Sequence, residues 1–255
     1  MKKYLLFIDI DGTLVPVGKQ KMDEKISKVF ERIQQDGHVV AIVSGRSQKS
    51  ILSVSGTEKA KYLCGLMGCS VIDMQTNEPV IHPKPIDKEL LRRFIEEINS
   101  LGLKWIYKDG YTEKSCFDDP ELIKKYVPKI VKKEEFYKDM ENLNVFQLLV
   151  NGNVPESLTK NYPEFMFIGM PGEYYDVLPK GATKANTVNY LKSLYPDHIS
   201  VAIGDSSNDI EMFENCLIKI AMDNAQEQLK QISTHITKSV QELGVLYAIE
   251  NILKI

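Results

Sequence analysis

The chain has 255 residues, enough to bury one large core or a core that carries an inserted domain. Charged residues make up 26% of it and the net charge is −3, so it lacks the basic surface that nucleic acids or acidic membranes require. No stretch is long and apolar enough to cross a bilayer, and the apolar run near the N-terminus stops at Asp9, too early for a signal peptide. We therefore expect neither a nucleic-acid partner nor a membrane partner.

The four cysteines are Cys64, Cys69, Cys116 and Cys216. They form no CxxC pair and have no histidine at a spacing suited to zinc. Free thiols in a reducing compartment explain this pattern best, which predicts a cytoplasmic protein.

The first elements alternate between strand and helix. KYLLFID, residues 3–9, is an apolar run typical of a strand. Residues 23–36 carry apolar side chains at helical spacing and are followed by Gly37 as a C-cap. HVVAIVSG, residues 38–45, is nearly continuously apolar, as expected for a strand covered by helices on both faces. Together they predict a βαβ unit.

The same alternation returns after residue 184, with a helix over 184–194, the strand ISVAIGD, a helix beginning within SNDIEMFEN, and the strand LIKIAM. Between the two groups, Pro83 and Pro85 interrupt the chain, and residues 83–178 show an amphipathic helix and strands of their own. We therefore predict an α/β fold: a Rossmann-like, doubly wound parallel-sheet core formed by residues 1–82 and 179–255, with an α+β cap domain inserted at 83–178.

Reactive side chains follow the predicted core strands, where the carboxyl ends of parallel strands share one edge. They are Asp9, Asp11, Ser44, Asp205, Asn208 and Asp209, together with Lys184 at the start of a helix. Clustered carboxylates repel one another unless a cation joins them, and Mg²⁺ suits a few carboxylates completed by water and a substrate phosphate. The lysine and the hydroxyl are suited to phosphate oxygens. The sequence thus predicts a Mg²⁺ site that acts on a small phosphorylated metabolite.

Four motifs in this order, DIDGT, SGR, the lysine of KGATK, and GDSSND, resemble those of the haloacid dehalogenase (HAD) superfamily. AMDNAQEQLKQISTHITKS followed by ELGV resembles the tail of its Cof-type branch, whose cap lies between the second and third motifs, as the insertion does here. The resemblance spans nearly the whole chain. It implies a phosphatase of the subfamily IIB type with a C2-type cap.

The resemblance implies a role for each motif residue. Asp9 is the expected nucleophile, which forms an aspartyl-phosphate, and Asp11 the general acid and base. Asp9, Asp205 and the backbone carbonyl of Asp11 are expected to bind Mg²⁺, with Asp209 supporting the metal site. The expected phosphate-binding residues are Ser44, Lys184 and Asn208.

Simpler interpretations exist for several of these residues. Ser44 alone is typical of a turn before Gly45, Asn208 of a helix N-cap, and Asp209 of an acid that complements a helix dipole. Lys180 competes with Lys184 for the third motif, and we prefer Lys184 because it opens the predicted helix. Arg46 is either directed toward substrate or an ordinary surface arginine.

Two stretches depart from the Cof-type pattern: Met67 replaces the usual Asn before Gly68, and Asp223 replaces Gly in the tail. Both affect expected substrate preference and leave the four motifs intact. Substrate contacts are expected from the cap, where the aromatic candidates are Tyr107, Tyr111 and the run Glu173-Tyr174-Tyr175, although such residues are more often core.

Three functions are compatible with these residues. The leading one is a Mg²⁺-dependent phosphatase, with sugar phosphates as the first substrate class and pyridoxal phosphate, flavin mononucleotide or other organic phosphates as alternatives. A sugar phosphomutase of the same superfamily is the second. A non-catalytic phosphate-binding module is the third, although such a protein is expected to lose Asp9 or Asp11. The sequence does not indicate an oligomeric state.

Overall fold

The computed structural model describes residues 2–110, 112–121, 123, 129–170 and 174–255, which form two compact units. Unit 1 comprises Met1–His82 and Thr183–Ile255, and unit 2 comprises Pro83–Ala182. The second junction lies between residues 182 and 183 rather than at the predicted 178/179. The reason is that β11 (Tyr174–Pro179) runs to its end paired with β10 (Phe165–Met170) in the sheet of unit 2.

Unit 1 is built on an eight-stranded sheet in the order β14-β13-β12-β1-β2-β3-β4-β5. The six strands from β14 to β3 run parallel, whereas β4 and β5 are antiparallel additions at one edge. Their bounds are β1 (Lys3–Ile8), β2 (Val39–Val43), β3 (Tyr62–Gly65), β4 (Ser70–Asp73), β5 (Glu78–Ile81), β12 (His198–Gly204), β13 (Ile218–Ala221) and β14 (His235–Ile236).

The parallel part of this sheet has a topological switch at β1. The chain proceeds from β1 to β2 and β3 on one side, and returns through β12 to β13 and β14 on the other. In such sheets ligands bind outside the carboxyl ends of the strands at this switch. The carboxyl ends of β1 and β12 are therefore where the fold places a site.

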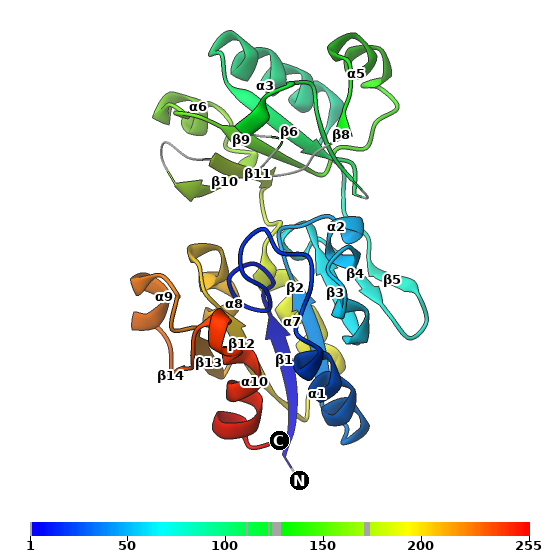
Figure 1. The fold of residues 1–255 in the computed structure, drawn as a ribbon. Helices are drawn as coiled ribbons and strands as arrows, with labels where there is room; N and C mark the ends of the chain where they lie inside the picture. The colour runs from blue at the N-terminus through cyan, green and yellow to red at the C-terminus, as the bar shows by residue number, and fades with distance from the viewer. Residues whose placement is uncertain (1, 111, 122, 124–128, 171–173) are drawn as a thin grey trace. The chain divides into compact units, whose positions relative to one another are not determined.

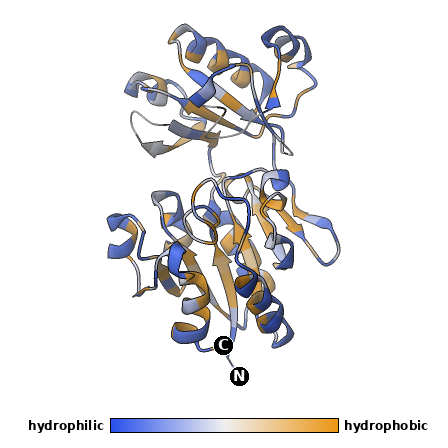
Figure 2. Ribbon diagram, viewed as in Figure 1, coloured by the Kyte–Doolittle hydropathy of each residue, from blue (hydrophilic) through white to orange (hydrophobic). Residues whose placement is uncertain are grey.

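Helices cover both faces of this sheet, and in Figure 1 α1 and α10 lie in front of it while α7 lies behind. The helices of unit 1 are α1 (Glu24–Gln35), α2 (Gln48–Leu52), α7 (Lys184–Leu194), α8 (Ile210–Glu214), α9 (Glu227–Gln231) and α10 (Gly244–Tyr247). Asp23 caps α1 by accepting from the Lys25 backbone at 2.8 Å, and Ile26, Val29, Phe30 and Ile33 are its buried face. Burial of such apolar stripes against strands that are apolar on both faces holds unit 1 together (Figure 2).

Unit 2 has its own six-stranded sheet in the order β10-β11-β9-β6-β7-β8, antiparallel except between β7 and β8. Its further elements are β6 (Lys104–Lys108), β7 (Glu113–Ser115), β8 (Lys129–Ile130), β9 (Gln147–Asn151), α3 (Lys88–Ser100), α5 (Lys133–Asp139) and α6 (Glu156–Asn161). A separate core around Trp105, Phe94 and Phe136 joins its helices to one face of the sheet. The predicted α/β fold, with a parallel sheet in the core, is confirmed.

Candidate active site

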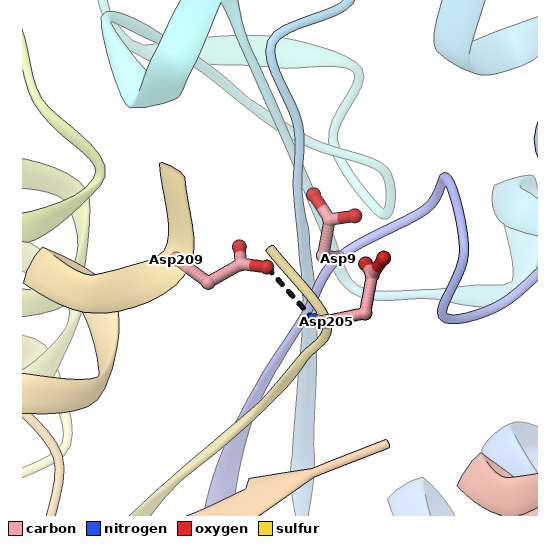
Figure 3. A group of neighbouring side chains, drawn as sticks. All are labelled: Asp9, Asp205 and Asp209. Atoms are coloured by element: carbon pink, nitrogen blue, oxygen red, sulfur yellow. Dashed lines mark hydrogen bonds between the residues drawn. The ribbon is translucent and has the colours of Figure 1, made fainter. Parts of the chain in front are cut away.

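The site lies at the carboxyl ends of β1 and β12. Asp9 directly follows β1 and is held in register by its backbone N–H, which donates to Ile203 of β12 at 3.0 Å. Asp205 directly follows β12, and Asp209 closes the short turn after it. Figure 3 shows the three carboxyl groups directed toward one region from these separate segments. One carboxylate oxygen from each lies within 4.8 Å of the others.

Lys184 joins two of these acids. It is the first residue of α7 and only 1% exposed, and its Nζ donates to Asp9 Oδ1 at 2.7 Å and to Asp209 Oδ1 at 2.6 Å. Its third contact is to Asn208 Oδ1, at 3.3 Å. Lys180 is exposed and belongs to unit 2. Of the two candidates for the third motif, Lys184 is thus the lysine that meets the acids.

Asp209 is a structural cap as well as a member of the acidic group. Its Oδ2 accepts from the backbone N–H groups of Asp205 at 3.0 Å and Ser206 at 3.1 Å, which completes a capping box with Ser206 (Figure 3 shows the first of these bonds). Asn208 is not the N-cap; its Oδ1 accepts from Ser206 Oγ at 2.9 Å as well as from Lys184. Asp209 is therefore both the acid at the start of this short helix and a neighbour of the other two acids.

Burial and mutual repulsion shape the electrostatics of the group. Burial raises the pKa of Asp9 well above its ordinary value; Lys184 opposes this shift, and Asp209 and Asp205 add to it. Burial, and to a smaller extent the charge of Asp209, raise the pKa of Asp205 to about 7, whereas the hydrogen bond from Thr13 acts to lower it. Burial alone lowers the pKa of Lys184, but Asp209 and Asp9 outweigh it and the net pKa lies above the usual lysine value. The lysine therefore remains charged, and its charge only partly offsets the burial and mutual repulsion that raise the pKa values of Asp9 and Asp205.

Asp11 is not one of the three acids of this group and is paired with Arg46. Arg46 Nε donates to Asp11 Oδ2 at 2.8 Å, and Arg46 Nη2 donates to Asp11 Oδ1 at 2.6 Å. The Arg46 side chain is 14% exposed and the Asp11 side chain 35%. Arg46 is thus not an ordinary surface arginine: within unit 1 it binds the candidate acid and base directly.

Ser44 is buried one residue beyond β2, beside β1 in a register that pairs Ile8 with Ile42. Its Oγ accepts from the Arg46 N–H at 3.2 Å. This local contact is the one expected of a serine in a turn before Gly45. The Ser44 carbonyl accepts from Met67 N at 3.0 Å, although Met67 has a φ of +57° and Leu66 a φ of +53°. Two successive buried side chains in this left-handed region cost on the order of 1–3 kcal/mol each.

Several contacts that motif reasoning missed hold the loops in place. Thr13 Oγ1 donates to Asp205 Oδ1 at 2.9 Å, and Asn224 Nδ2 donates to the Gly12 carbonyl at 2.8 Å. Gly12 has a φ of +83°, and a Cβ there would lie 2.2 Å from Asp205 Oδ2. The signals were present in DIDGT and in AMDNAQ, but sequence alone does not say what a threonine or asparagine contacts across the fold.

The cap candidates lie in unit 2. Tyr107 is 2% exposed and packs against Trp105 and Phe136, so it is a core residue of that unit. Tyr175 also packs on this core, whereas Tyr174 packs against Ile106 and Leu149. Tyr111 and Glu173 lie outside the described residues.

Comparison with known proteins agrees with this geometry. The sequence model of the haloacid dehalogenase-like hydrolase family matches residues 6–249, so the chain belongs to this family of hydrolases, as the four motifs predicted. A putative phosphatase of Bacillus subtilis, YkrA, is 28% identical over 260 residues, which cover 99% of this chain and 98% of the relative. A putative phosphatase of Streptococcus pyogenes is 27% identical and covers 96% of each chain.

Solved structures share the fold over nearly the whole chain. A protein from Geobacillus kaustophilus superposes with a TM-score of 0.82 at 26% identity, covering 99% of this chain and 100% of the other. A HAD subclass IIB sugar phosphatase superposes with a TM-score of 0.83 at 19% identity, with coverage of 99% and 100%. The second likeness, at that identity, concerns the fold alone.

Proposed function

We propose that this chain is a Mg²⁺-dependent phosphatase that hydrolyses small phosphorylated metabolites through an aspartyl-phosphate on Asp9. The observation that carries the proposal is the pairing of a buried Asp9 with a buried Lys184 inside an acidic group at the switch point of the sheet. The names of the two relatives that span the chain, both putative phosphatases, support it.

The donor set fits Mg²⁺. Three carboxyl groups with oxygens within 4.8 Å of one another offer the hard oxygen ligands that this ion prefers, and only one lysine bonds to them. Asp209 already accepts hydrogen bonds on both oxygens, so Asp9 and Asp205 would hold the ion, with the Asp11 carbonyl as the third protein ligand and Asp209 in support. When bound, Mg²⁺ would neutralise charge on the transferring phosphoryl group.

Asp9 is positioned as the nucleophile. Its Oδ1 accepts from Lys184, and among the described residues no hydrogen bond to its Oδ2 is found, which leaves that oxygen available for attack. In the proposed first step Asp9 forms a bond to phosphorus while the bond to the leaving oxygen breaks and Asp11 gives that oxygen a proton. In the second step water attacks the phosphoryl group and Asp11 takes its proton. The bond between phosphorus and the Asp9 oxygen breaks, which restores the Asp9 carboxylate and releases inorganic phosphate.

The remaining motif residues would bind the phosphate. Lys184 supplies a charge that is already aligned with the nucleophile, and the hydroxyl of Ser44 and the amide of Asn208 supply donors at the same edge of the sheet. Such fixed donors, placed where charge develops, are usually the largest contribution to catalysis of group transfer.

For the substrate we propose sugar phosphates first. This rests on the motif resemblance and on the fold shared with a subclass IIB sugar phosphatase. All four cysteines are free, which supports a reducing compartment, and we propose the cytoplasm. No helix among the described residues is long and apolar enough to cross a membrane.

The test is release of inorganic phosphate from a panel of sugar phosphates, pyridoxal phosphate, flavin mononucleotide and p-nitrophenyl phosphate, with Mg²⁺ and with EDTA. We expect metal-dependent release from at least one compound and none from Asp9→Asn. A folded protein that releases no phosphate from any of them, or an Asp9→Asn variant with near-normal turnover, would contradict the proposal. Incubation with a hexose bisphosphate would then test phosphomutase activity.

A further inference from the structure

The further inference concerns the ion pair between Arg46 and Asp11. One guanidinium occupies both oxygens of this carboxylate, at 2.8 and 2.6 Å, in the two-pronged geometry that only arginine provides. The pair is not a loose surface contact, because the arginine side chain is only 14% exposed. It therefore fixes the orientation of Asp11.

The backbone of Arg46 is also anchored. Its backbone N–H donates to Ser44 Oγ at 3.2 Å, and its carbonyl accepts from the N–H of Leu66 at 2.8 Å. The third guanidinium nitrogen, Nη1, lies 3.4 Å from Gln20 Oε1 and 3.4 Å from the carbonyl of Ser50. The guanidinium thus has further polar neighbours besides Asp11.

A carboxyl group that carries a proton cannot accept from arginine on both oxygens, because the protonated oxygen is then a donor. Asp11 must therefore release one prong of Arg46 whenever it holds the proton that goes to the leaving oxygen. As that proton departs, the second oxygen becomes an acceptor again and both prongs can close on the carboxylate. The fork is already closed on Asp11 in this structure, so its contribution is to orient the carboxyl group.

We propose that Arg46 is a positioning residue for proton transfer by Asp11, holding the Asp11 side chain by both carboxylate oxygens. The inference rests on the proposed phosphatase function. It predicts that the loss of kcat/KM on replacing Arg46 depends on how much the leaving group needs a proton. A sugar alkoxide needs one, whereas p-nitrophenolate is stable as an anion and leaves without it.

The experiment compares kcat/KM for a hexose 6-phosphate and for p-nitrophenyl phosphate in wild type, Arg46→Lys and Arg46→Gln. This parameter covers the steps up to release of the alcohol, so hydrolysis of the aspartyl-phosphate does not obscure it. General acid catalysis contributes roughly 10²–10⁴-fold, and we expect Arg46→Gln to lower kcat/KM at least about tenfold more for the sugar phosphate than for p-nitrophenyl phosphate. Arg46→Lys keeps the positive charge but loses the bidentate geometry, so its kcat/KM for the sugar phosphate should lie between those of wild type and Arg46→Gln.

Controls separate this role from a structural one. Lys49→Ala removes a positive charge from an exposed position of α2 and should leave both substrates nearly unchanged. Adding Arg46→Gln to Asp11→Asn should cause little further loss, because the two residues act as one unit. Equal losses for both substrates, or full additivity with Asp11→Asn, would overturn the inference while the phosphatase stands. Absence of phosphate release in wild type would instead refute the proposed function.

Discussion

Replacing Lys184 by Met should destabilise unit 1 as well as abolish activity. The side chain is 1% exposed and its Nζ hydrogen-bonds Asp9 at 2.7 Å and Asp209 at 2.6 Å, so Met of similar length would leave two buried carboxylates without their cation. Removing one partner of a buried pair costs about 3–5 kcal/mol. Each kcal/mol lowers the Tm of a domain of this size by about 2–4 °C, so we expect a fall of about 6–20 °C.

The assay is thermal unfolding followed by circular dichroism, in EDTA and then in excess Mg²⁺. The matched control is Lys180→Met, which changes an exposed lysine of the same KGATK segment and should leave the Tm nearly unchanged. Mg²⁺ at a hundred times its dissociation constant would stabilise the folded protein by about 2.7 kcal/mol, so it should recover part of the loss in Lys184→Met. A Lys184→Met variant as stable as wild type in EDTA would refute the electrostatic account of this site.

Two further predictions concern Gly12 and His38. Gly12→Ala places a Cβ 2.2 Å from Asp205 Oδ2 and should lower both Tm and turnover, whereas Gly18→Ala, with a similar φ of +80° and nothing within 4 Å, should show only the backbone cost of about 1–2 kcal/mol. Equal losses in the two variants would argue against the close approach. Burial lowers the pKa of His38, whose Nδ1 accepts from Tyr4 N at 3.0 Å. The contribution of His38 to the free energy of unfolding is therefore complete above about pH 6.5 and is lost as the pH falls through the folded-state pKa. In urea unfolding at a series of pH values, the stability of His38→Gln should fall less steeply toward acid pH than that of wild type. An equally steep fall would contradict this reasoning.

The ends of the site-bearing strands were accessible from sequence, because apolar runs that stop at an acid mark where buried backbone reaches an edge. Asp9 and Asp205 follow β1 and β12 directly, and Lys184 begins α7, as their patterns indicated. These features depend on local chain chemistry, which residues next to one another in sequence largely determine.

Pairings across the fold were not accessible in this way. Arg46 was expected to meet substrate or solvent, but the structure joins it to Asp11, 35 residues away. Thr13 contacts Asp205 across 192 residues, and a buried lysine, Lys108, lies 3.8 Å from Asp176 on the sheet of unit 2. Such contacts depend on strand register and crossing, which a single sequence does not specify.

The junction after unit 2 shows the same limit. The sequence placed the boundary at 178/179, but β11 ends at Pro179, which pairs with Phe165 in the sheet of unit 2. The next residues then lead to Thr183, which precedes α7. The end of unit 2 depends on the pairing of β11 with β10, so it can be located only once that pairing is known.

The most direct test of the account is the site of covalent phosphorylation. Asp11→Asn should slow hydrolysis of the intermediate, so mixing this variant with the best substrate of the panel and Mg²⁺, followed by acid quench and peptide mass spectrometry, should find a phosphoryl group on the peptide that contains Asp9. Fragmentation assigns the modified residue, and Asp9→Asn in the same background is the control that should carry none. A phosphoryl group on Asp9 is the predicted result. Turnover with no phosphoryl-enzyme at Asp9, or phosphorylation at another residue, would contradict the central claim.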